Sequence, residues 1–319
     1  MLIKNFFLTV RDRGIVVAIS ASINLLRMLT ENRLLGRKLV KRNIHQYKMH
    51  LDASDSGLCR GLILFGTREV DHKILLEKIL KPGMTVLDIG ANIGYYALME
   101  LDLIGSSGKL IAVEPSPSNL SIFRKNLELN NISGVRIVNG AISDKSEKKD
   151  FYLAHQGNLN TFHATGTGAK HLNGEVIEVD SYTVPEIMID EGGLDLIRMD
   201  VEGHEVEVLN GMYDEVIKGN LTPTIIFETH LTRYDSDHDM SLTLQKYFDS
   251  GYKIKYIASS WQKGSEIIES RGYIGSSPIA TDGVQRKIYS DLSNIDGIDF
   301  ICNTGGARTV VLEHITRSN

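Results

Sequence analysis

The chain has 319 residues, of which 42% are hydrophobic and 24% are charged, and it contains 29 glycines and 6 prolines. This length suits one large α/β domain or two smaller ones, and the composition excludes collagen-like, disordered and disulfide-rich proteins. Cys59 and Cys302 form no Cys-x-x-Cys or Cys/His metal spacing, which argues against cysteine-bound structural zinc and against a secreted disulfide framework. We therefore expect a reducing, cytoplasmic setting.

The net charge of −5 is unevenly distributed along the chain. Residues 1–42 carry nine Lys or Arg against two acidic residues, a charge of +7, so the rest of the chain carries −12. The best apolar run, over residues 15–26, is 12 residues long and interrupted by polar positions, whereas a membrane span needs about 20 residues. We expect residues 1–50 to form a basic helical segment packed on the main domain. The alternative is peripheral contact of residues 1–42 with anionic lipid on the inner face of the membrane.

From about residue 84, short apolar runs alternate with segments of helical periodicity, which is typical of a parallel sheet covered by helices. Helices are predicted from Pro117 to about residue 130 and over residues 202–218. Two long insertions interrupt the pattern, one near residues 141–183 that resembles a hairpin and one over residues 258–308. Strands are predicted at residues 84–89, 109–114, 135–139, 194–200, 223–228, 252–257 and 309–313.

The strongest local signal is the run VLDIGANIG, from Val86 to Gly94. A strand ends at Asp88, a turn follows with Gly90 and Gly94, and a helix begins near Tyr95. Open α/β sheets bind ligands at the carboxyl ends of their strands. The free N–H groups of the new helix favour a carboxylate or a phosphate there.

The next two predicted strands complete a nucleoside site. Glu114 ends the second strand, where a carboxylate can accept hydrogen bonds from ribose hydroxyls. The third strand ends at Asn139, and the small Ala141 follows, so this end can bracket an adenine. Because the three strand ends lie at one edge of the sheet, the sequence predicts an adenosine-type cofactor.

Two such cofactors compete at this site. A dinucleotide fingerprint needs glycine at the positions that Asn92 and Tyr95 occupy here, and both side chains would obstruct a pyrophosphate. S-adenosylmethionine fits better, with its carboxylate at the helix N-terminus, its ammonium near Asp88 and its ribose on Glu114.

Together these motifs resemble the FkbM family of S-adenosylmethionine-dependent methyltransferases over roughly residues 50–257. The resemblance is carried by the glycine turn, VEPS at 113–116, DVEGHE at 200–205, LNG at 209–211 and PTIIFE at 223–228. It implies an α/β, Rossmann-like class I methyltransferase fold. In that fold a seven-stranded, mostly parallel sheet has helices on both faces and an antiparallel last strand. It further implies one methyltransferase domain over residues 51–319 that methylates a hydroxyl of a saccharide, glycolipid or natural product. His204 departs from the family, which more often has a small residue there.

The candidate base must have a pKa near the working pH, and acidic or imidazole groups at the strand ends qualify. We expect the catalytic residues to be Asp200, Glu202 and His230, with Glu228 and His204 as further candidates for the base. Asp200, Glu228 and His230 could also ligate a divalent metal, but no spacing requires one and we expect none. The expected cofactor-binding residues are Glu69, Asp88, Gly90, Ala91, Asn92, Gly94, Tyr95, Glu114, Pro115, Asn139, Ala141 and Asp200.

Two other functions remain open. One is a nicotinamide-dependent Rossmann oxidoreductase, which shares the sheet. The other is a non-catalytic, membrane-associated module that only binds an adenosine metabolite. The negative charge of the chain argues against nucleic acid as a partner and leaves a small-molecule or glycan acceptor.

Overall fold

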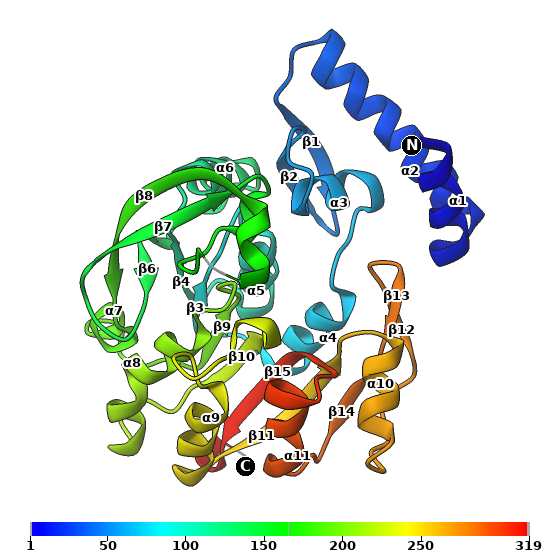
Figure 1. Cartoon of the computed structure of the whole chain (residues 1–319). Coiled ribbons are helices and arrows are strands. Elements are labelled where there is room, and N and C mark those ends of the chain that lie inside the picture. The colour runs from blue at the N-terminus through cyan, green and yellow to red at the C-terminus, as the bar shows by residue number, and fades with distance from the viewer. Residues whose placement is uncertain (1, 165, 318–319) are drawn as a thin grey trace.

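A computed structural model of the chain describes residues 2–164 and 166–317. Its centre is an eight-stranded sheet with the strand order β14-β11-β15-β10-β9-β3-β4-β5 (Figure 1). The neighbours from β10 to β5 pair in parallel, whereas β15 and β14 run antiparallel to the strands beside them. These eight strands are β3 (Thr85–Ile89), β4 (Lys109–Glu114), β5 (Arg136–Asn139), β9 (Leu196–Met199), β10 (Thr224–Glu228), β11 (Tyr252–Ser259), β14 (Ile288–Ser290) and β15 (Ala307–His314).

Helices pack on the sheet, and among the described residues two two-stranded sheets and one three-stranded sheet lie outside it (Figure 1). The helices are α1 (Leu2–Arg13), α2 (Ile15–Leu29), α3 (Leu58–Phe65), α4 (Val70–Ile79), α5 (Tyr95–Ile104), α6 (Pro117–Leu129), α7 (Val184–Met188), α8 (Glu205–Ile217), α9 (Met240–Asp249), α10 (Gln262–Glu269) and α11 (Asn294–Ile298). The remaining strands are β1 (Leu39–Ile44), β2 (Tyr47–Asp52), β6 (Ala141–Ile142), β7 (Lys148–Ala154), β8 (Leu172–Tyr182), β12 (Ile279–Thr281) and β13 (Val284–Arg286).

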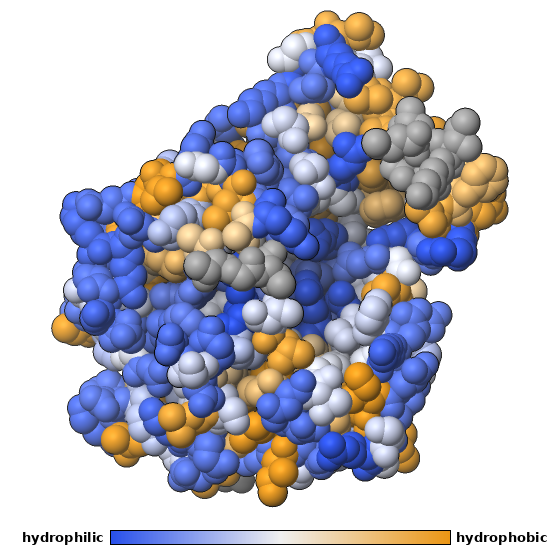
Figure 2. Space-filling model, viewed as in Figure 1, coloured by the Kyte–Doolittle hydropathy of each residue, from blue (hydrophilic) through white to orange (hydrophobic). Residues whose placement is uncertain are grey.

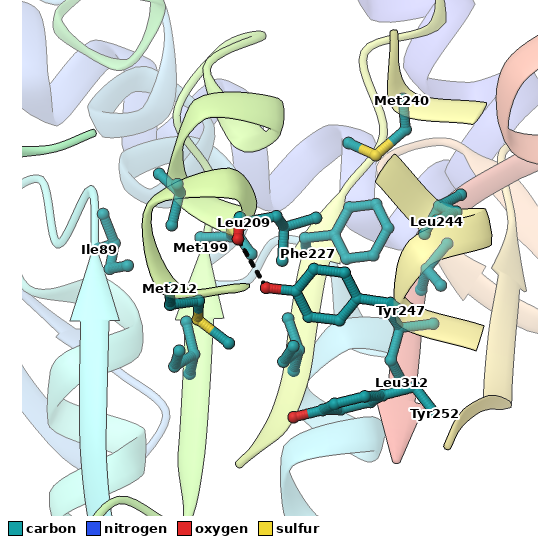
Figure 3. Close-up of a cluster of buried hydrophobic side chains, with 14 of the residues drawn as sticks. Ile89, Met199, Leu209, Met212, Phe227, Met240, Leu244, Tyr247, Tyr252 and Leu312 are labelled. Carbon is teal, nitrogen blue, oxygen red and sulfur yellow. Dashed lines mark hydrogen bonds between the residues drawn. The ribbon is translucent and has the colours of Figure 1, made fainter. Parts of the chain in front are cut away.

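Two hydrophobic cores lie on opposite faces of the sheet, because successive residues of a strand point to opposite sides. In β3, Leu87 and Ile89 belong to one core and Val86 to the other. The core that contains Leu87 includes Leu209 of α8 and residues of α9, and Figure 3 shows these side chains packed against the strands. There the hydroxyl of Tyr247 donates to the backbone oxygen of Leu209 at 2.7 Å, which satisfies a buried polar group.

The predicted strands and helices are confirmed, and so is the mostly parallel α/β sheet. Helix α6 begins where Ser116 caps it and Pro117 occupies its first turn, as the sequence predicted. The structure adds an eighth strand, β14, which belongs to the segment predicted as an insertion over residues 258–308. The other insertion contains the antiparallel pair of β7 and β8, as expected for a hairpin.

The N-terminal segment is less helical than expected. Helix α2 ends at Leu29 and one further turn ends at Leu34, after which β1 and β2 pair as an antiparallel hairpin across the expected boundary at residue 50. The reason lies in the alternation of β1, in which Val40, Arg42 and Ile44 are buried and the residues between them are exposed. Within the described residues, every helix is too short or too polar to cross a bilayer.

Candidate functional site

The loop between β3 and α5 closes tightly against the end of β9. Gly90 has a φ of 79°, and a Cβ added there would lie 2.3 Å from the backbone oxygen of Asp200. Only glycine therefore fits this position. Gly94 has a φ of 85°, and its Cβ would meet the ring of Phe123 at 2.2 Å, so this glycine serves the packing of α5 on α6.

Glu114 ends β4 beside this loop and is 4% exposed. Its Oε2 accepts from the backbone N–H of Asn92 at 2.8 Å. Its Oε1 accepts from the backbone N–H of Ser116 at 2.9 Å and from the side-chain amide of Asn119 at 3.1 Å. Burial raises the pKa of Glu114 to about 7, although these three donors lower it. A carboxylate offers about four acceptor positions, so Oε2 can still accept from a ligand hydroxyl.

A cleft opens over these strand ends. Figure 2 shows the surface hollowed between the N-terminal elements and the sheet, with hydrophilic residues gathered there. Small and apolar side chains line the part of the cleft next to Glu114, and they include Ala91, Val113, Ala141 and Ile142. The cleft therefore offers a carboxylate, a glycine turn and an apolar wall, which fits an adenosine-type cofactor.

Asp88 lies beneath the cleft rather than in its lining. It is fully buried, and its Oδ1 accepts from Nη1 of Arg198 at 3.2 Å. Arg198 also donates to Oδ2 of Asp200 at 3.3 Å and lies 4.2 Å from the ring centre of Tyr96. Burial raises the pKa of Asp88 in spite of Arg198. Asp88 thus holds Arg198 under the floor of the cleft and does not reach the space where a cofactor ammonium was expected.

A second arginine, Arg308, contacts two acidic residues of the cleft lining, Glu69 and Glu228. Arg308 of β15 contacts Oε1 of Glu69 at 2.8 Å through Nη2 and Oε1 of Glu228 at 2.5 Å through Nη1. Burial alone would raise the pKa of Glu69, but Arg308 and the neighbouring Arg68 hold it well below its usual range. For Glu228 burial prevails over Arg308, and its pKa rises to about 8.

Glu202 and His230 form another charged group, beside those of Arg198 and Arg308. Burial raises the pKa of Glu202 to about 7, although His230 lowers it. His230 is buried too, yet Glu205 and, more weakly, Glu202 raise its pKa to about 10. Its Nδ1 lies 2.9 Å from Oε1 of Glu205, and its Nε2 lies 3.6 Å from Oε2 of Glu202. His230 is therefore an imidazolium at neutral pH, with no lone pair to accept a proton.

Asp200, Glu202 and His230 have ligand atoms within 4.8 Å of one another, close enough to surround a metal ion. Nδ1 of His230 also lies 2.9 Å from Oε1 of Glu205, while its Nε2 faces Asp200 and Glu202 at 3.9 and 3.6 Å. These side chains therefore form a charged network beside the cleft.

The structure brings most of the predicted site residues together in the lining of one cleft. Three predicted cofactor-binding residues, Asp88, Gly94 and Asn139, are not part of this lining. Asp88 is bound to Arg198, and Gly94 packs against α6. At the end of β5, Gly140 lines the cleft in place of Asn139. His230 is also outside the lining. The predicted residues in the lining are Glu69, Gly90, Ala91, Asn92, Tyr95, Glu114, Pro115, Ala141, Asp200 and Glu202.

Sequence reasoning missed three arginines of the cleft, Arg68, Arg198 and Arg308. Arg198 carried a usable signal, because an arginine inside the apolar run LDLIRMD of a central strand must be paired when buried. Arg308 carried none, since its partners Glu69 and Glu228 lie 239 and 80 positions away in the sequence.

Comparison with known proteins identifies a family domain in this chain. The family model described as the methyltransferase FkbM domain matches residues 88–254, slightly more than half of the 319 residues. A protein named Methyltransferase 1 from Beauveria bassiana is 29% identical over 147 residues, which cover 41% of this chain and 59% of that protein. A ribosomal protein L11 methyltransferase from Acetivibrio thermocellus is 30% identical over 93 residues, covering 28% of this chain and 29% of that protein. The chain therefore spans less than two thirds of the length of both relatives.

Solved structures of methyltransferases are also similar. The FkbM methyltransferase from Methylobacillus flagellatus KT shares 13% identity, with a TM-score of 0.36, over 86% of this chain and 62% of that chain. The TYW2 protein of M. jannaschii, solved in complex with AdoMet, shares 12% identity, with a TM-score of 0.38, over 88% of each chain.

Proposed function

The chain belongs to the FkbM family of S-adenosylmethionine-dependent methyltransferases, and from this premise we propose that it methylates a hydroxyl of a saccharide, glycolipid or natural product. One observation carries the proposal. The buried carboxylate of Glu114 and the glycine turn at Gly90 adjoin a cleft that continues to Glu202. A nucleoside held on Glu114 leaves that far part of the cleft for an acceptor.

When bound, S-adenosylmethionine supplies an electrophilic methyl group on its sulfonium. Glu114 then binds the ribose through Oε2, and Ala91, Ala141 and Ile142 surround the base. Asp88 supports the floor through Arg198, and this replaces the direct contact with the ammonium that the sequence suggested.

We assign the general base to Glu202, because its pKa of about 7 matches the pH at which an acceptor proton must be removed. His230 remains protonated and acts as a positioning residue, since its Nε2 lies 3.6 Å from the Glu202 carboxylate. Nη1 of Arg308 contacts Oε1 of Glu228, so Arg308 positions Glu228 in the lining of the cleft. The polar character of this side favours an acceptor with several hydroxyls.

Incubation with methyl-labelled cofactor and fractionated glycans, lipids and hydroxylated small molecules tests the proposal. We expect label on an oxygen of one of these products in the wild type, and loss of the label in Glu202→Gln with cofactor affinity unchanged. Reduction of a substrate by NADH would identify the oxidoreductase alternative. Cofactor binding without transfer to any acceptor class would identify the non-catalytic alternative.

The N-terminal helices support a second proposal, peripheral contact with an anionic membrane surface. One side of α2 is buried, as at Ala21. On this helix, the side-chain amide of Asn24 donates a hydrogen bond to the backbone oxygen of Leu64 in α3 at 3.1 Å. The other side exposes Val16, Ile23 and Leu26, which are 76%, 62% and 67% accessible. Figure 2 shows hydrophobic residues gathered over these helices. Apolar exposure beside a charge of +7 suits a lipid surface that carries negative charge.

Sedimentation with vesicles tests this contact. We expect the protein to bind vesicles of phosphatidylglycerol and phosphatidylcholine, to bind pure phosphatidylcholine more weakly, and to lose binding when Val16 and Ile23 are both replaced by Glu. Leu242→Glu, on the exposed side of α9, is the matched control and should bind normally. Equal binding by the double variant and the control would refute the contact, and a dimer without lipid binding would assign the surface to a second copy of the chain.

A further inference from the structure

Three histidines and one glutamate converge from three segments beside the acceptor end of the cleft. His163 lies in the loop between β7 and β8, His204 and Glu207 lie at the start of α8, and His238 precedes α9. Nδ1 of His204 is 3.4 Å from Nε2 of His163 and 3.3 Å from Oε2 of Glu207. Nδ1 of His238 is 2.5 Å from Oε1 of Glu207. Ligand atoms of His163, Glu207 and His238 all lie within 4.8 Å of one another.

Two of these separations match the ligand spacing of a tetrahedral metal site. Zinc binds imidazole nitrogen and carboxylate oxygen at about 2.0–2.1 Å, so neighbouring ligand atoms of a tetrahedron are about 3.3–3.4 Å apart. The distances from Nδ1 of His204 to His163 and to Glu207 have this length. The contact between Nδ1 of His238 and Oε1 of Glu207, at 2.5 Å, is shorter than this spacing and would lengthen around a bound ion.

The hydrogen bonds of Ser143 fix which nitrogen of His204 carries the proton. The Ser143 hydroxyl donates to Asp144 at 3.0 Å and accepts from Nζ of Lys149 at 2.9 Å. Its Oγ lies 3.0 Å from Nε2 of His204, and since its proton is already directed to Asp144, it accepts from Nε2–H. A neutral His204 then has a lone pair on Nδ1. A hydrogen bond from the second ring nitrogen to a neighbouring group is the usual support of a metal-bound histidine.

With this tautomer, the lone pair of His204 Nδ1 faces the carboxylate oxygen of Glu207 at 3.3 Å with no proton between them. Oε2 of Glu207 is buried and has no hydrogen-bond partner among the described residues. Two electron pairs in this arrangement repel each other, whereas a cation placed between them is attracted to both. A cation at this centre would therefore be attracted to both groups.

We propose that His163, His204, Glu207 and His238 bind a divalent transition-metal ion of the zinc type. Three imidazoles and one carboxylate are borderline ligands that suit zinc, rather than the all-oxygen set of magnesium or calcium. Four protein ligands close the coordination shell, so the ion is structural. It fastens the inserted β7–β8 segment and the segment before α9 to the start of α8.

This site is distinct from Asp200, Glu228 and His230, the possible metal ligands in the sequence, for which we expected no metal. Sequence spacing gave no indication of it, because His163 lies 41 positions before His204 and His238 lies 34 positions after it. His204 is also part of the cleft lining. A metal bound to Nδ1 of His204 would hold the His204 side chain in one orientation on the acceptor side. The family more often has a small residue at this position.

Metal binding by the full chain tests the proposal directly. Protein stripped with dipicolinate is titrated with Zn²⁺, and bound zinc is counted by mass spectrometry after gel filtration. We expect a single bound equivalent in the wild type and its loss in His163→Ala and His238→Ala. His155→Ala, an exposed histidine of the same insertion, is the matched control and should keep the metal. Co²⁺ in the wild type should give the intense visible bands of tetrahedral coordination.

Near-ultraviolet circular dichroism of each variant separates loss of metal from loss of fold without using the methyltransferase assay. Zinc should also raise the unfolding temperature of the stripped wild type and of His155→Ala, but not of His163→Ala or His238→Ala. The proposal is overturned if the folded wild type retains no zinc. It is equally overturned if the two ligand variants retain as much zinc as the control, or if the cobalt spectrum is octahedral.

Discussion

Replacing Glu114 by Gln tests the cofactor site at its most informative position. The substitution keeps the size and planarity of the side chain but removes its charge and one of its two oxygens. In the structure, Oε2 has one donor, the backbone N–H of Asn92, and so retains capacity for a ribose hydroxyl. A hydrogen bond to a charged group contributes about 1.5–3 kcal/mol. With about 1.4 kcal/mol per factor of ten, Glu114→Gln should weaken S-adenosylhomocysteine binding by roughly 10- to 100-fold.

The pH dependence provides a second measure of the same contact. Burial raises the pKa of Glu114 to about 7, and only the ionised form accepts hydrogen bonds with both oxygens. Below that pKa, ligand binding must first remove a proton, so affinity should rise with pH and level off above it. From pH 6 to pH 8 the ionised fraction rises by about tenfold. Wild-type affinity should rise correspondingly, and Glu114→Gln should lack this component.

Isothermal titration calorimetry with S-adenosylhomocysteine at pH 6, 7 and 8 measures both effects. Thermal unfolding of each protein shows whether the loop that Glu114 holds remains folded. Because Glu202 and Glu228 also titrate in this cleft, the decisive quantity is the difference between wild type and variant. Wild-type affinity in Glu114→Gln, or the same pH dependence in both proteins, would refute the assignment of the ribose to Glu114.

Four further substitutions test the rest of the site. Glu202→Gln should lower kcat by about 10²–10⁴ without changing cofactor affinity, as measured by initial rates and calorimetry. The rising limb of the wild-type pH–kcat profile should lie near pH 7, and His230→Gln should shift it to higher pH, because the imidazolium lowers the pKa of Glu202. A limb that does not move would exclude this coupling. Gly90→Ala places a Cβ 2.3 Å from a backbone oxygen and should abolish cofactor binding, whereas Gly272→Ala, with open space and a φ of 88°, should retain it. Arg198→Met leaves the carboxylates of Asp88 and Asp200 without their partner. It should lower the free energy of unfolding in urea by about 3–5 kcal/mol, and a loss below about 1 kcal/mol would show that these ion pairs contribute little.

Much of the fold could be predicted because it depends on local patterns. Apolar runs bounded by glycine and proline identified the seven expected strands, and Ser116 with Pro117 identified the start of α6. The eighth strand, β14, was missed because it has only three residues, too few to show a period. The β1–β2 hairpin was missed because its strands are only six residues long and continue the basic sequence of the helices before them.

The site could be predicted most directly at its strand ends and turns. Gly90 and Glu114 were found because strand ends and turns can be recognised along the chain. The ion pairs of Asp88 and His230 could not be predicted, since their partners Arg198 and Glu205 reach them only after folding. Such ion pairs depend on distances across the sheet, and sequence spacing does not contain them.

A structure of the full chain with bound S-adenosylhomocysteine tests the central claim most directly. We expect the ribose hydroxyls within hydrogen-bond distance of Oε2 of Glu114, the base against Ala141 and Ile142, and the sulfur directed toward the part of the cleft that contains Glu202. A nucleoside bound away from Glu114, or a sulfur directed away from Glu202, would contradict it.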